Sequence, residues 1–149
     1  MIKNFHLSKQ NLPNFISKVT ALVETGDYVA NVTERTKNRT ELQNRISHSW
    51  YNELANELKA DTALGYKCFC KLHFGIGILR SEDDEFRKVY DTAIKGLSYE
   101  QKLQVMKILP VTSIMTTKQL SQYLEAVKEH FLIHEGFDLK FPADYLNES

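Results

Sequence analysis

Cysteine is scarce in this chain, and so are long apolar runs. The two cysteines, Cys68 and Cys70, form a C-x-C pair, which rarely reaches the geometry of a disulfide. No stretch approaches the roughly 20 apolar residues of a membrane span. The N-terminal segment MIKNFHLSKQ lacks the apolar core of a signal peptide. We therefore expect a reduced, cytoplasmic protein that does not enter a membrane.

An excess of charge of either sign is also missing. The 149 residues include 19 Lys and Arg and 19 Asp and Glu, so the formal net charge is zero. This balance excludes a strongly basic, histone-like nucleic-acid binder. The charges nevertheless gather in blocks: residues 35–80 hold eight basic and four acidic side chains, and residues 102–120 hold three lysines and no acid. Such blocks allow a basic groove on a neutral protein, although chance and helix-end bias produce similar blocks.

The apolar pattern predicts an α+β fold in a single domain over residues 1–149. A hydrophobic fraction of 42% and this length suit one core without a disulfide or metal staple. Residues 2–7 and 28–35 read as strands, and a helix from Leu12, ended by Gly26, lies between them. We expect this small N-terminal β-α-β element to be followed by a mainly helical remainder, with a partly ordered tail over residues 137–149.

Helical spacing recurs along that remainder. Apolar residues spaced by four, Trp50 among them, predict a long core helix over residues 40–60. A shorter helix capped by Asp61 or Thr62 is expected to stop at Gly75 and Gly77. Residues 111–115 are short and apolar and are expected to form a buried connector or a small strand. Further helices are predicted over residues 86–97, from a capping box of Ser98 and Gln101 to Pro110, and from Thr116 or Thr117 to Gly136.

An acidic run from Glu82 to Glu85 is the one pattern in the sequence that suits a metal-dependent nuclease. Four acids before a helical stripe also complement a helix dipole, and one run cannot converge on an ion by itself. Neither a glycine-rich phosphate loop nor a G-x-S-x-G motif is present. We therefore expect a protein that is not an enzyme and has no cofactor.

Cysteine and histidine also give incomplete metal patterns. Cys68, Cys70 and His73 make half a zinc site with no second ligand pair in the sequence. His130 and His134 share a helical face without the glutamate of a metalloprotease motif. The expectation is that the chain holds no metal, with the histidine pair left as an open question.

The stretch from Arg35 to Trp50, RTKNRTELQNRISHSW, interleaves cations with amides and one imidazole. Cations neutralise phosphates, amides bond base edges, and an aromatic ring stacks on bases. Two lysines on the next helix are expected to extend this surface, although a solvated helix face has a similar composition. The predicted nucleic-acid-binding residues are Arg35, Lys37, Arg39, Gln43, Asn44, Arg45, His48, Lys67 and Lys71.

Two short patterns resemble one family. In the first, a strand that ends in E-R and a polar turn lead into a helix beginning R-x-x-x-Q-N-R; here these residues are Glu34, Arg35, Arg39, Gln43, Asn44 and Arg45. In the second, T-S-x-M precedes a helix with an L-E-x-[IV] core and a terminal glycine, here Thr112, Ser113, Met115, Leu124, Glu125, Val127 and Gly136. Together they resemble the NinB (Orf) recombination proteins of lambdoid bacteriophages. The resemblance covers about residues 28–50 and 111–141, and it implies some β-hairpin in residues 61–110, where the residues themselves predict helices.

The resemblance implies a non-enzymatic accessory of phage or prophage recombination in the cytoplasm of a bacterial host. Such proteins look like homodimers that bind single-stranded DNA and the host single-strand-binding protein and help to load a recombinase. The basic block at residues 102–120, beside Met106, Ile108 and Leu109, suits the acidic tail of that partner. Two other classes stay open: a small metal-dependent nuclease, and a protein–protein adaptor that binds no DNA.

Overall fold

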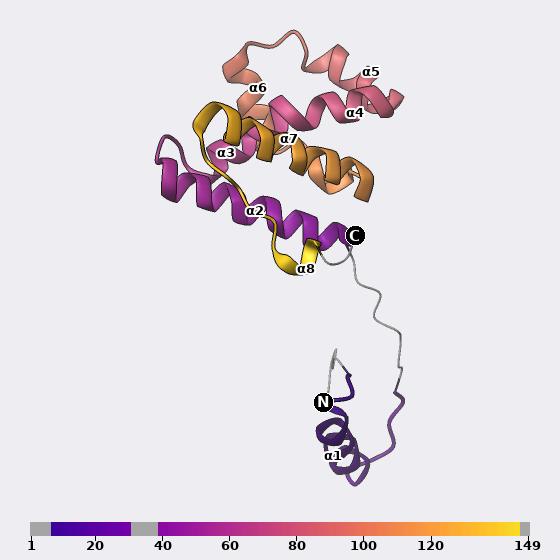
Figure 1. Cartoon of the computed structure of the whole chain (residues 1–149). Coiled ribbons are helices and arrows are strands. Elements are labelled where there is room, and N and C mark those ends of the chain that lie inside the picture. The colour runs from indigo at the N-terminus through magenta and orange to yellow at the C-terminus, as the bar shows by residue number, and fades with distance from the viewer. Residues whose placement is uncertain (1–6, 31–38, 147–149) are drawn as a thin grey trace. The chain divides into compact units, whose positions relative to one another are not determined.

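The computed structural model describes residues 7–30 and 39–146. The chain divides into two compact units, residues 1–36 and 37–149. No helix in the described residues is both long and apolar enough to cross a membrane. The first unit holds α1 (Leu12–Val23), and the second holds α2 (Arg39–Leu58), α3 (Ala63–Cys70), the π-helical segment η1 (Lys71–Gly75), α4 (Ile76–Glu82), α5 (Asp84–Ala93), α6 (Tyr99–Met106), the 3-10 helix η2 (Thr112–Ile114), α7 (Thr117–Glu135) and α8 (Ala143–Leu146) (Figure 1).

All regular structure in the described residues is helical, so the predicted α+β fold with a β-α-β element is wrong. Most of the two expected strands lies in residues 1–6 and 31–38, outside the described residues, but residues 28–30 have no regular structure. Val29 is 93% exposed and Tyr28 is 45% exposed. A strand needs a paired neighbour and a face to bury, and these residues have neither, so their β propensity alone does not form one.

The helix predicted from Leu12 is confirmed as α1. Pro13 lies in its first turn, where the missing N–H costs nothing. Asn11 precedes the helix without capping it through its side chain, because Asn11 Oδ1 accepts a hydrogen bond from the Ser8 main-chain N–H at 2.7 Å. None of the residues of α1 is buried.

The core of the second unit lies between α2 and α7, which run side by side (Figure 1). The long helix predicted over residues 40–60 and the core position of Trp50, which is 2% exposed, are confirmed. The buried hydroxyl groups of Tyr51 and Tyr123 meet across this interface at 2.6 Å. A shared hydrogen bond satisfies both hydroxyls, which would otherwise be costly to bury.

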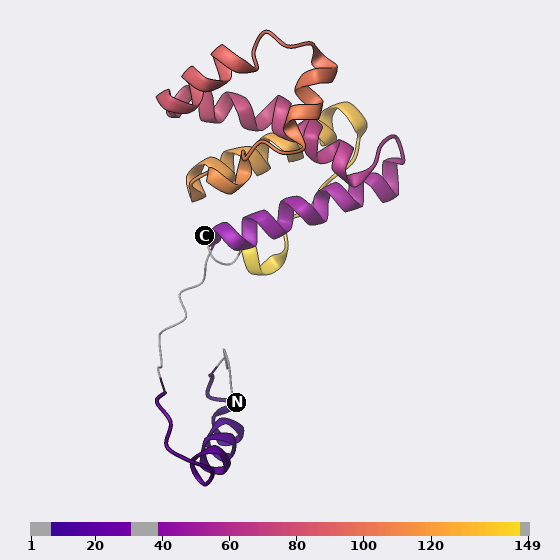
Figure 2. The same cartoon turned by 180° about the vertical axis from the view of Figure 1, so that it is seen from behind.

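The segments α3, η1 and α4 form one continuous helical rod, so the predicted stop at Gly75 and Gly77 is wrong. Gly75 lies in the π-helical turn, and a Cβ at this position would lie 2.6 Å from Val111 Cγ1. The glycine therefore permits a close approach of the connector after α6 instead of ending the helix. Figure 2 shows α6 crossing the rod from the other side. Residues 61–110 contain helices and no strand, which confirms the prediction from the residues and corrects the hairpin implied by the resemblance.

Helix ends are well specified by the sequence. Ser98 with Gln101 and Thr116 with Gln119 form complete capping boxes at the starts of α6 and α7. Gly136 ends α7 in the left-handed conformation, with a φ of 64°, as its position predicted.

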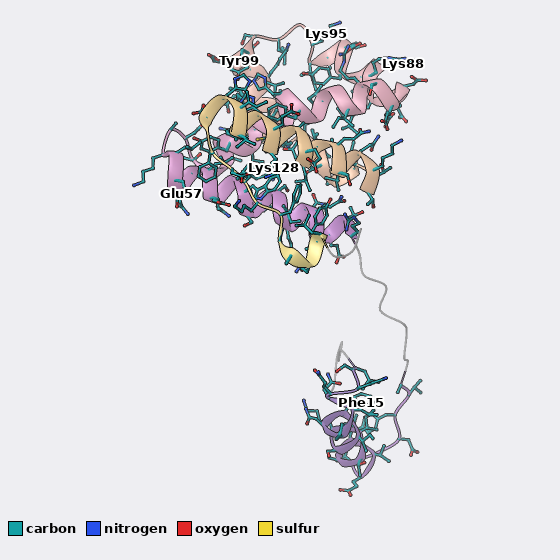
Figure 3. The ribbon with its side chains drawn as sticks, viewed as in Figure 1. Phe15, Glu57, Lys88, Lys95, Tyr99 and Lys128 are labelled. Atoms are coloured by element: carbon teal, nitrogen blue, oxygen red, sulfur yellow. The ribbon has the colours of Figure 1, made fainter. Side chains whose placement is uncertain are left out.

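The segment that follows α7 packs back across α2. The indole N–H of Trp50 donates to the carbonyl of Lys140 at 3.0 Å, and Leu139 is fully buried. Lys128 on α7 forms an ion pair with Asp138 at 2.6 Å, and Figure 3 labels this lysine on the side where the segment passes. The segment therefore contributes two buried side chains, Leu139 and Tyr145, to the core of the second unit.

Candidate nucleic-acid interface

Arg39 and Gln43, the first two predicted DNA-binding residues on α2, form contacts within the protein. Arg39 donates to the carbonyl of Tyr145 at 3.3 Å, and its guanidinium lies 4.0 Å from the centre of the Tyr145 ring. Gln43 is fully buried, and its Nε2 lies 2.9 Å from Ser121 Oγ and 3.1 Å from Tyr145 Oη. These two side chains hold α8 and α7 against α2. Arg35 and Lys37 lie outside the described residues.

Four other predicted residues converge on one groove, which we call the basic groove. Asn44 and His48 line it from α2, and Lys67 and Lys71 line it from the rod. The rest of the lining comes from the connector, residues 107–113, and the open groove has a volume of about 360 Å³. Asn44 and His48 are one helical turn apart, as are Lys67 and Lys71, so each pair projects from one helix face.

The cations at the surface of the basic groove are unpaired. Lys107 is exposed and Lys67 is half-buried, and neither forms an ion pair with any described residue. No carboxylate is among the described residues that line the groove. An anion entering there meets ammonium groups, and the described lining offers no acid to compete with it.

Lys71 has a different role at the floor of this groove. It is 4% exposed, and its ammonium group donates to the carbonyls of Met106 and, at 2.6 Å, Leu109. Burial lowers the pKa of Lys71, and the charge of Lys67 lowers it further. Lys71 therefore fixes the connector that carries Lys107.

The charges of these lysines act on the pKa values of neighbouring groups. Burial raises the pKa of the Cys68 thiol, while the charges of Lys71, Lys107 and Lys67 act in the opposite direction and the charge of Asp61 adds to the rise. The pKa of His48 is lowered by burial first and by Lys67 second. Burial and the charge of Lys67 thus bias the His48 imidazole toward its neutral form.

A smaller hollow, the side hollow, adjoins the basic groove along the seam of α2 and α3. It has a volume of about 110 Å³ and is lined by His48, Tyr51, Asn52, Ala63, Leu64 and Lys67. His48 and Lys67 line both depressions. The His48 ring meets the Tyr51 ring edge-on, with centroids 5.9 Å apart.

Arg45 is exposed on α2 but does not line the basic groove. Conversely, the residues predicted from the sequence did not include Lys107, Thr112 or Ser113, which line the basic groove. The acid-free block at residues 102–120 was the signal for Lys107, whose place opposite α2 depends on the tertiary fold.

Residues of the acidic run form the start of α5 and one tertiary contact. Asp83 caps α5 by accepting from the Phe86 N–H at 3.0 Å. Asp84 pairs with Arg87 at 2.8 Å, and Glu82 accepts from Gln119 at 2.9 Å. These contacts give three of the four acids in the run a structural role.

The histidine pair lies among aromatic rings. His130 and His134 have ring centroids 4.7 Å apart, and His130 packs 5.1 Å from Phe74. Cys68 and Cys70 are free and buried. No group of three or more His, Cys, Asp or Glu among residues 7–30 and 39–146 has a geometry that could hold a metal ion.

Comparison with known proteins adds no relative: no family profile, curated protein sequence or solved structure matches this chain.

Proposed function

We propose that this protein binds single-stranded DNA, with the phosphate backbone in the basic groove. The observation that carries the proposal is the convergence of Asn44, His48 and Lys67 with Lys107 on one groove whose described lining holds no acid. Phosphate contacts from lysines supply affinity, and amide and imidazole groups supply contacts to bases.

The narrower role in this proposal rests on the resemblance to the NinB (Orf) proteins. Here the protein is an accessory of phage or prophage recombination that helps to load a recombinase, acts as a homodimer and contacts the host single-strand-binding protein. Ile108 is 84% exposed beside Lys107, which supports a contact with an acidic tail that ends in apolar residues. Met106 is fully buried and takes no part in such a contact.

A gel-shift titration of single-stranded and duplex oligonucleotides at two salt concentrations tests DNA binding. The expected result is preference for the single strand and weaker binding at the higher salt, because bound lysines release counterions from the strand. Binding of neither strand contradicts the proposal and favours the adaptor. Cleavage that needs magnesium or manganese and is lost in Asp83→Asn with Asp84→Asn favours the nuclease instead.

A further inference from the structure

We propose that the side hollow takes one unpaired nucleobase of the strand whose phosphates lie in the basic groove. This inference rests on the proposed function and names the part of the nucleic acid that the second depression recognises. It goes beyond phosphate binding because it assigns a separate site to the base.

The two depressions are neighbours that share two lining residues. His48 and Lys67 line both, so one nucleotide can place its phosphate against Lys67 on one side and its base on the other. A nucleotide has this division of chemistry, with a charged phosphate and a flat, largely apolar base joined by a sugar.

The lining of the side hollow matches a base. Leu64 is 47% exposed and, with Ala63, offers an apolar surface. The His48 imidazole offers a ring of the kind that stacks on unpaired bases, and its edge-on contact with Tyr51 orients it. Asn52, one turn after His48 on α2, brings an amide with a donor and an acceptor for a base edge.

Such a site discriminates single strands from duplex. A base in a duplex is stacked and paired, and taking it out costs unstacking and unpairing energy. A base in a single strand enters without that cost. The side hollow, rather than the lysines, is therefore the source of the single-strand preference.

The test compares two oligonucleotides of equal length, an oligothymidylate and an abasic strand with the same number of phosphates, by fluorescence anisotropy at one salt concentration. The wild-type protein is expected to bind the oligothymidylate about five-fold more tightly or better, which is the low end of base–aromatic stacking. His48→Ala and Asn52→Ala are expected to weaken binding of the oligothymidylate and leave the abasic strand unchanged.

Two controls localise the effect. Asn56→Ala removes an exposed amide one turn further along α2, outside both depressions, and is expected to change neither affinity. Lys107 lines only the basic groove, so Lys107→Ala is expected to weaken binding of both strands equally.

The outcomes separate the two claims. Equal wild-type affinity for the two strands overturns the base site while the DNA-binding proposal stands. A preference for oligothymidylate that survives both His48→Ala and Asn52→Ala also overturns it. Binding of neither strand overturns the proposed function itself. The wild-type comparison needs no variant, so a misfolded substitution cannot leave the inference undecided.

Discussion

The buried ammonium group of Lys71 donates to the main-chain carbonyl of Leu109 over 2.6 Å. Its second acceptor is the carbonyl of Met106, the last residue of α6. A lysine in the π-helical turn therefore satisfies the carbonyl at the end of α6 and one in the connector that follows it. This contact holds one wall of the basic groove against the rod.

Replacing Lys71 with Met tests that role. The change keeps an unbranched apolar stem but leaves two carbonyl groups without their donor, so we expect unfolding free energy to fall by about 1–3 kcal/mol. Urea denaturation followed by circular dichroism measures the loss. Lys67→Met, on the half-buried lysine one turn earlier, is the control and is expected to stay within about 0.5 kcal/mol. Equal stability of Lys71→Met and wild type would mean that the ammonium does not hold the wall.

Gly75 and Gly77, both in the rod, give a second matched pair of variants. Gly75→Ala places a methyl group 2.6 Å from Val111 Cγ1 and is expected to cost about 1–3 kcal/mol of overpacking. Gly77→Ala meets nothing within 4 Å and is expected to stabilise the helix by up to about 1 kcal/mol. Thermal and urea unfolding measure both. Similar effects of the two substitutions would contradict the close approach of the connector.

Stability is expected to fall as the solution becomes mildly acidic. Burial lowers the pKa of His73 and His130 below the ordinary value of 6.5, and for His130 the neighbouring His134 and His73 add to the effect. The unfolded chain then binds more protons than the folded one as the pH falls. The free energy of unfolding is therefore highest above about pH 6.5 and declines as the pH falls from there toward the lowered pKa values of the folded protein.

Urea unfolding at a series of pH values from 7.5 to 5 checks this direction. Asp138 titrates outside that window, because its hydrogen bonds to Lys128 and Lys140 lower its pKa to about 2. In the variants His73→Gln and His130→Gln the dependence is expected to flatten. Stability that rises toward pH 5 would contradict burial of neutral imidazoles.

The stacking of Arg39 on Tyr145 is expected to stabilise the docking of α8. A double-mutant cycle with Arg39→Ala and Tyr145→Leu should give a coupling energy of about 0.5–2 kcal/mol, the range of cation–π contacts from exposed to desolvated sites. Thermal unfolding of the four proteins provides the measurement. Strictly additive losses would show that the guanidinium and the ring do not stabilise each other.

Much of the helical content was predictable from local signals. Capping boxes at Ser98 and Thr116 and the glycine at 136 act through neighbours three or four residues away, so the sequence shows them directly. The continuation of the helix through Gly75 was not predictable in this way. Glycine is required at position 75 because Val111, which is distant in sequence, packs against it, and no local pattern indicates that contact.

The candidate site likewise has residues that local spacing predicts and residues whose position depends on tertiary packing. The polar face of α2 predicted Asn44 and His48, because their spacing on one helix is local. Gln43 was predicted at the surface, yet it is fully buried against α7 and α8, and that burial depends on packing between distant segments. The partner wall at Lys107 also depends on how α6 crosses the rod.

The most direct measurement is the dependence of single-strand affinity on salt in two double variants with the same loss of charge. Lys67→Ala with Lys107→Ala removes the unpaired cations of the basic groove, whereas Lys88→Ala with Lys95→Ala removes lysines on and after α5, away from α2 (Figure 3). Each phosphate contact to a single strand contributes about −0.7 to the log–log slope of affinity against salt concentration. The groove variant is predicted to flatten that slope by about 1.4 and the α5 variant to leave it unchanged. Equal slopes for the two variants would contradict a DNA path through the basic groove.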